Sequence, residues 1–108
     1  MTNTGVHLIL NELKAGLKGI YLNRLKGLYL FGSYARREQS NQSDIDVIVV
    51  LDRFDPTYSA EIERTSDLTS ELSLKHKVTI SKVYVLESDW LRKPTPFLDH
   101  VREEAIAA

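Results

Sequence analysis

The chain has 108 residues, of which 43% are hydrophobic and 27% charged, with a net charge of −1 and no cysteine. Two independent cores would each be too small at this length, so we expect a single domain over residues 1–108. Disulfides and thiolate metal sites are excluded, the near-neutral charge argues against general nucleic-acid binding, and no apolar stretch is long enough to span a membrane, which favours a cytoplasmic protein.

The first part of the chain predicts a helix followed by a strand. Apolar residues recur at spacings of three and four between His7 and about Leu25, which predicts a helix with one buried face. The run Leu28–Phe31 predicts a short strand, because it is apolar and rich in aromatic residues. We expect a helical turn over Ser33–Glu38 and a polar surface connection over Gln39–Ser43.

The middle of the chain predicts two further strands with a long helix between them. Ile45–Leu51 is apolar on both faces beyond Asp46, as expected of a central strand that is covered on each side. Helical spacing of apolar residues predicts a second long helix over residues 58–75. The segment Val78–Leu86 is apolar and β-branched, which predicts a third strand, and a short helical turn is expected over Glu87–Trp90.

The C-terminal part predicts a last helix. Thr95 followed by Pro96 is a typical N-cap with proline at the first helical position. The apolar side of this helix consists of Phe97, Leu98, Val101 and Ile106. Helices and strands therefore alternate along the chain, which indicates an α/β or α+β protein.

Two aspartates, Asp44 and Asp46, mark the start of the predicted central strand. Residues two apart on a strand point to the same face, roughly 6.5 to 7 Å from each other along the backbone. Carboxylates among valines and isoleucines are costly to bury unless a cation or hydrogen-bond donors compensate them. Mg²⁺ is the natural candidate, because it is commonly bound by one or two carboxylates together with water and phosphate oxygens.

Gly32 and Ser33 lie where the first predicted strand leads into a helical turn. Glycine lets the backbone approach a ligand closely, and the amides that follow, together with the serine hydroxyl, can donate hydrogen bonds to an anion. A phosphate site on this loop and a metal site on the neighbouring strand are what transfer of a nucleotidyl group requires.

The two motifs together resemble those of a known family. The segments FGSYARR (31–37) and SDIDVIVV (43–50) resemble the DNA polymerase β-like nucleotidyltransferase superfamily, in particular its minimal bacterial and archaeal members. The resemblance implies a small mixed β-sheet of about three to four strands flanked by helices. A single minimal nucleotidyltransferase domain would thus occupy residues 1–108.

The resemblance also implies roles for individual residues. Asp44 and Asp46 would be the catalytic carboxylates that bind one or two Mg²⁺ ions with ATP. The phosphates would be bound by Gly32 and Ser33, with Arg36 as a further phosphate contact. Tyr34, next to this loop, is expected to pack in the core rather than line the nucleotide site.

Active members of the superfamily carry a third carboxylate on the strand beside the Asp-x-Asp strand, where it completes the metal site or activates the attacking hydroxyl. In this chain the corresponding positions hold Thr79 and Ser81, which cannot act as anionic ligands or as bases at neutral pH. Asp52, Asp55 or Glu61 could substitute only if the fold brought one of them inward, and each is expected to face solvent.

The small size of the chain implies a partner. The resemblance implies that the chain is one half of a two-gene module. The other half of such a module is a small helical HEPN protein. In the toxin–antitoxin versions, the transferase adds AMP to a tyrosine of the HEPN toxin. The resemblance therefore implies an antitoxin of this kind. The alternatives are a catalytically degenerate nucleotidyltransferase-like protein that binds nucleotide, neutralises its partner by contact only, or does both, and an enzyme that transfers to a small molecule. Homo-oligomer formation is left open.

Overall fold

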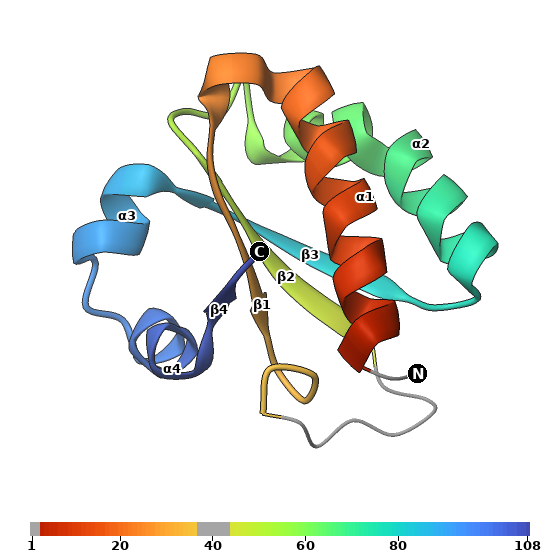
Figure 1. Cartoon of the computed structure of the whole chain (residues 1–108). Helices are drawn as coiled ribbons and strands as arrows, with labels where there is room; N and C mark the ends of the chain where they lie inside the picture. The colour runs from red at the N-terminus through yellow and green to blue at the C-terminus, as the bar shows by residue number, and fades with distance from the viewer. Residues whose placement is uncertain (1–2, 37–43) are drawn as a thin grey trace.

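The protein is built on a four-stranded mixed sheet, as expected from the resemblance (Figure 1). The structure is a computed structural model that describes residues 3–36 and 44–108. The strands lie in the order β3-β2-β1-β4, where β1 is Leu25–Phe31, β2 is Ile45–Leu51, β3 is Ile80–Leu86 and β4 is Ile106–Ala107. The pair β2 and β3 is parallel, whereas β1 is antiparallel to both of its neighbours, β2 and β4.

Helices lie on both faces of the sheet (Figure 1). The helices are α1 (Asn3–Tyr21), the short 3-10 helix η1 (Leu22–Arg24), α2 (Tyr58–His76), α3 (Glu87–Arg92) and α4 (Pro96–Glu104). Helices α1 and α2 lie side by side over one face, and α3 and α4 pack on the other. In the described part of the chain, no helix is both long and apolar enough to cross a bilayer.

The predicted central strand is confirmed with the same bounds, since β2 spans Ile45–Leu51. Alternate residues of β2, from Ile45 to Leu51, pack against α1 and α2, while Ile48 and Val50 pack on the side of α3 and α4. All of these side chains are almost fully buried, and burial of each contributes about 1.5–3 kcal/mol. Because β2 is covered on both faces, it fixes the position of the residues at its start.

The first predicted helix is too long at its C-terminal end. The α-helix stops at Tyr21, and Leu22 has a positive φ of 53°, which an α-helix cannot accommodate. Leu25 is the first residue of β1 and pairs with Leu51, so β1 begins three residues before the predicted strand. Leu25 fitted the apolar periodicity of the helix because it packs, as a residue of β1, against the same hydrophobic core as α1.

The third strand begins at Ile80 rather than at Val78. Lys77 takes a left-handed conformation, with φ 55° and ψ 47°, and its backbone N–H donates to Ser73 O, which ends α2. Residues in this conformation form a common helix C-cap, which delays the extended backbone of the strand.

The end of the chain also differs from the prediction. The predicted N-cap Thr95 is confirmed, since its hydroxyl accepts a hydrogen bond from Leu98 N. However, α4 ends at Glu104, and Ile106 pairs with Leu30 in β4 instead of continuing the helix. Phe97 and Ile106 are about half exposed, so the apolar side of α4 is limited to Leu98 and Val101.

In α2, the buried face agrees with the prediction only in part. Thr65 and Leu72 are buried at the predicted helical spacing, but Ile62 is 43% exposed and Glu61 is fully buried. The Glu61 carboxylate is ion-paired with Arg24 and Arg64 and accepts a hydrogen bond from Asp55 N at 2.9 Å. The expectation that Glu61 faces solvent is therefore wrong, because two arginines and a backbone amide compensate its buried charge.

Candidate active site

Asp46 lies near the start of β2, directly between the two neighbouring strands. It is paired with Phe31 of β1 and with Ser81 of β3. Since Ile45 and Val47 pack against α1 and α2, Asp46 points to the opposite face, where α3 and α4 lie. Its side chain is half-buried, and Asp44, just before the strand, is exposed.

Gly32 makes room for the Asp46 carboxylate. It has a φ of +76°, which L-residues with side chains rarely adopt, and it follows the residue that pairs with Asp46. A Cβ placed on Gly32 would overlap Asp46 Oδ2 and lie 3.2 Å from Asp46 Cγ. Both the backbone conformation and the close approach therefore require glycine at this position.

Replacing Gly32 with alanine is expected to lower the free energy of unfolding by about 1–2 kcal/mol through the left-handed backbone alone, and to displace the Asp46 carboxylate. Thermal unfolding of the purified variant measures the first effect. Gly19→Ala is the matched control, because a Cβ at Gly19 in α1 meets nothing within 4 Å. The control should match or exceed the stability of the parent protein, and equal losses for both variants would contradict this account of Gly32.

Ser33 and Arg36 belong to a single turn that follows Gly32. Arg36 N donates to Gly32 O at 3.1 Å, as in one turn of an α-helix. The predicted helical turn is thus confirmed as far as Arg36, and its remaining residues and the connection 37–43 lie outside the described residues. Ser33 is partly buried, and the Arg36 side chain is 40% exposed.

Glu104, at the end of α4, is a residue of this site that the sequence did not reveal. Its carboxylate accepts a hydrogen bond from Gly32 N at 3.0 Å and another from Arg36 Nη1 at 2.9 Å. A signal was present, because Glu104 continues the three-residue spacing of the buried Leu98 and Val101. A carboxylate on the buried side of α4 needs hydrogen-bond donors, and Gly32 N and Arg36 Nη1 provide them.

Among the described residues, the charges that act on Asp46 are mostly negative. Burial raises the pKa of Asp46 above its ordinary value, and the negative charges of Asp44 and Glu104 raise that pKa further. The positive charge of Arg36 acts in the opposite direction. A cation bound at this position would be stabilised by the same carboxylates that repel one another without it.

The structure places Ser81 of β3, and Thr79 just before that strand, beside the aspartates. Ser81 pairs with Asp46, and Thr79 O accepts a hydrogen bond from Ile45 N, between the two aspartates. The residue of β3 that pairs with Asp46 therefore carries a hydroxyl rather than a carboxylate.

The three other acidic residues considered as substitutes lie at the far end of β2. Asp52 directly follows β2, about 20 Å along the strand from Asp46. Asp52 and Glu61 share Arg24 as an ion-pair partner, and Asp55 N donates to the Glu61 carboxylate. Asp52 and Asp55 are exposed as expected, and none of the three completes the site.

The donor set is compatible with Mg²⁺ bound together with a nucleotide. Within residues 3–36 and 44–108, no three histidine or acidic side chains are arranged to hold a metal ion by themselves. Asp44 and Asp46 provide two carboxylates, one of them half-buried with a raised pKa. Mg²⁺ commonly takes one or two carboxylates and completes its shell with water and phosphate oxygens, so two aspartates suit a metal that arrives with a triphosphate.

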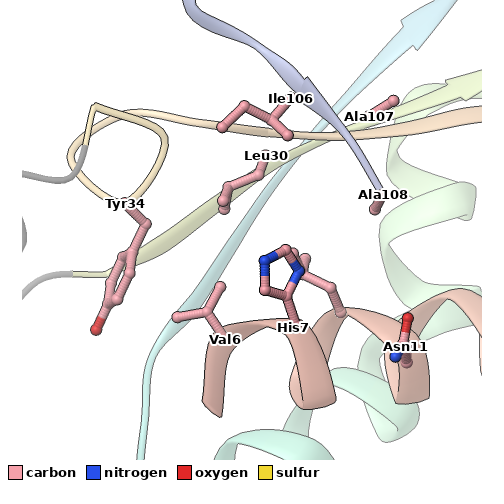
Figure 2. Close-up of a pocket in the computed structure, with 9 residues that line it drawn as sticks. Val6, His7, Asn11, Leu30, Tyr34, Ile106, Ala107 and Ala108 are labelled. Carbon is pink, nitrogen blue, oxygen red and sulfur yellow. The ribbon is translucent and has the colours of Figure 1, made fainter. Parts of the chain in front are cut away.

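A cavity of about 230 Å³ on the opposite face does not belong to this site. Figure 2 shows Tyr34 and Leu30 facing Val6 and His7 of α1, with the residues of β4 beside them. Tyr34 is 4% exposed and packs in the core with α1, which confirms that it is a packing residue. Its side chain lies on the α1 face of the sheet, whereas Asp46 points to the α4 face.

Comparison with known proteins identifies relatives along most of the chain. A family model described as polymerase beta, nucleotidyltransferase matches residues 17–101. Three proteins of Methanocaldococcus jannaschii, each named as a candidate protein adenylyltransferase, are 33%, 30% and 40% identical to the chain. These matches cover 78%, 91% and 74% of this chain and 77%, 93% and 83% of the relatives.

Solved structures share the fold. A candidate nucleotidyltransferase from Sulfolobus solfataricus aligns over 97% of this chain and 77% of its own, with a TM-score of 0.54 and 17% identity. The toxin–antitoxin complex MntA–HpeT aligns with a TM-score of 0.55 and 18% identity, and a toxin–antitoxin structure with AMP-PNP with 0.53 and 21%. Both alignments cover 99% of this chain and 72% of the other.

The mixed sheet, the Gly32 turn against Asp46 and the family match over residues 17–101 lead to one conclusion. The chain belongs to the polymerase β nucleotidyltransferase family.

Proposed function

We propose that the protein transfers AMP from ATP, with Mg²⁺, to a tyrosine hydroxyl of a helical HEPN toxin and so acts as its antitoxin. The observation that carries the proposal is the contact of Gly32 with the Asp46 carboxylate, because it joins the phosphate loop and the metal-binding strand in one site. The names of the Methanocaldococcus relatives support protein adenylylation. The toxin–antitoxin structures, one of them with AMP-PNP, support both the nucleotide and the kind of partner.

The residues of the site have separate roles in this proposal. Asp44 and Asp46 bind Mg²⁺, which neutralises the triphosphate and orients it for in-line attack when it is bound. Ser33 and the amides of the turn bind phosphate oxygens, and Arg36 contributes positive charge. The tyrosine oxygen forms a bond to the α-phosphorus, the bond from that phosphorus to the bridging oxygen breaks, pyrophosphate leaves, and the hydroxyl proton passes to solvent.

A contact-only antitoxin is the second candidate function. It is favoured by one observation, namely that Ser81 rather than a carboxylate faces Asp46 from β3. In this case the protein binds its partner and neutralises it without transferring a nucleotide.

One experiment separates the two functions. The purified protein is incubated with the product of the adjacent gene, ATP and Mg²⁺, and the partner is analysed by intact-mass and peptide mass spectrometry. We expect the mass of one or more AMP groups on tyrosine, and none when Mg²⁺ is removed by a chelator. An unmodified partner that is nevertheless neutralised would establish the contact-only function and refute the transferase.

A further inference from the structure

We propose that Glu104 is a positioning residue that orients Arg36 and the Gly32 turn to receive a triphosphate. The inference rests on the proposed nucleotide-binding function of this site. It concerns a residue 72 positions away from Gly32 in the sequence, on an element that carries none of the motif residues.

The two hydrogen bonds of Glu104 join α4 to the loop. One carboxylate oxygen, Oε1, accepts from Gly32 N at 3.0 Å, and the other, Oε2, accepts from Arg36 Nη1 at 2.9 Å. The Glu104 side chain is only 12% exposed, whereas the Arg36 side chain is 40% exposed, so water screens the ion pair from the Arg36 side only. Glu104 thus contacts Gly32, where the turn begins, and Arg36, the last described residue of that turn.

The backbone on both sides of this contact is fixed. Ile106 pairs with Leu30 in the sheet, so Glu104 and Gly32 each lie two residues from the same strand pair. Ala105 N donates to Val101 O, which keeps Glu104 in the last turn of α4. Because backbone hydrogen bonds hold both segments, the Glu104 carboxylate can fix the positions of the Gly32 turn and of the Arg36 guanidinium.

Glu104 is a carboxylate partner of Arg36 other than Asp46. The positive charge of Arg36 also acts on Asp46, although burial and the charge of Asp44 raise the pKa of that carboxyl overall. A guanidinium that bonded directly to Asp46 would compete with a cation for that carboxylate. Glu104 gives Arg36 a separate partner, and since a guanidinium has five N–H donors, Arg36 can bond to Glu104 and still donate to a phosphate oxygen.

The residue before Glu104 provides a control variant. Glu103 carries the same charge but is exposed, so its side chain lacks the partly buried position of Glu104. The other charged neighbour is His100, whose Nε2 lies 3.8 Å from Glu104 Oε2. Glu103→Gln therefore matches Glu104→Gln in chemistry and sequence location.

The test is the affinity of the purified protein for MgATP and for AMP, measured by isothermal titration calorimetry. We expect E104Q to weaken MgATP binding about tenfold, as for the loss of one charge-assisted hydrogen bond. AMP binding should be unchanged, because AMP lacks the outer phosphates. E103Q should bind both nucleotides like the parent protein.

A double-mutant cycle separates positioning from a general structural effect. In an Arg36→Gln background, E104Q should cause a smaller loss of MgATP affinity, because the guanidinium that Glu104 positions is already gone and only the Gly32 turn is left for it to orient. An equal loss in both backgrounds, or equal MgATP affinity for E104Q and the parent protein, would overturn the inference. If the parent protein itself binds no MgATP, the proposed function fails together with this inference, whereas parent binding that is unaffected by E104Q refutes only the role of Glu104.

Misfolding of the variant is detected by a second readout that needs no nucleotide. The amide proton of Gly32 should shift in the NMR spectrum of E104Q, since its acceptor changes from a carboxylate to an amide oxygen. The resonances of β2 should stay in place. Widespread changes across the sheet would show that Glu104 supports the fold as a whole, and would count against a local positioning role.

Discussion

Replacing Asp46 with asparagine is expected to reduce nucleotidyl transfer about a hundredfold or more, the scale on which enzymes respond to losing one preorganised electrostatic partner. Asparagine has nearly the same shape as aspartate but no negative charge to hold a cation. The measurement is the initial rate of AMP incorporation into the partner at saturating MgATP. Asp67→Asn, at an exposed position on α2, is the control and should transfer at the parent rate.

The same variant should not lose stability at neutral pH. The folded-state pKa of Asp46 is raised above its ordinary value. Stability linked to this group is therefore fully present below the unfolded pKa and is lost as the pH rises through the folded pKa. Asparagine stays neutral at every pH, so D46N should unfold at or above the parent temperature at pH 7. A drop in the unfolding temperature would show that Asp46 has a structural role that this account omits.

Replacing Glu61 with glutamine is expected to cost about 3 kcal/mol of unfolding free energy, or about 15 °C in unfolding temperature. The Glu61 carboxylate is fully buried and balances Arg24 and Arg64. Glutamine would remove the carboxylate with which both arginines pair, and Arg24 would keep its longer ion pair with Asp52 at 3.7 Å. The value lies at the low end for a buried pair, because the Arg64 side chain is 34% exposed and is partly screened by water.

Thermal and urea unfolding at pH 7 measure this loss, with Glu63→Gln as the control at an exposed position on the same helix. Burial raises the pKa of Glu61, but the hydrogen bonds from Asp55 N and Arg24, together with the positive charges of Arg24 and Arg64, outweigh it, and the pKa is lowered overall. The stabilisation is therefore present above the unfolded pKa and lost as the pH falls through the folded pKa. The difference between E61Q and the parent protein should shrink in acid, and a difference independent of pH would contradict the ion-pair explanation.

The sequence was sufficient to find the centre of the candidate site. The run Ile45–Leu51 predicted a central strand because its apolar character is local and continuous. Gly32 stood out because a glycine where a strand leads into a turn lets the backbone approach a ligand closely, and its φ of +76° is a conformation that residues with side chains rarely adopt. The sequence did not reveal that Gly32 also makes room for the Asp46 carboxylate. This close approach follows from the pairing of β1 with β2.

Element boundaries were less predictable where one apolar pattern crosses from one element into another. Leu25 and Ile106 continue helical spacing in the sequence, yet both lie in strands. Periodicity reports which residues are apolar, whereas the end of a helix depends on backbone conformation and on hydrogen-bond partners. For Ile106 that partner is Leu30, far away in the chain.

The sequence by itself thus determined that helices and strands alternate in an α/β or α+β protein, and it determined the central strand and the local motifs around Gly32, Asp44 and Asp46. Only the tertiary structure decided that Glu104 joins the Gly32 turn, that Glu61 is buried between two arginines, and that Ser81 faces Asp46. The physical reason is the same in each case. A charged side chain takes its environment from partners that the fold brings together, and those partners are distant in the sequence.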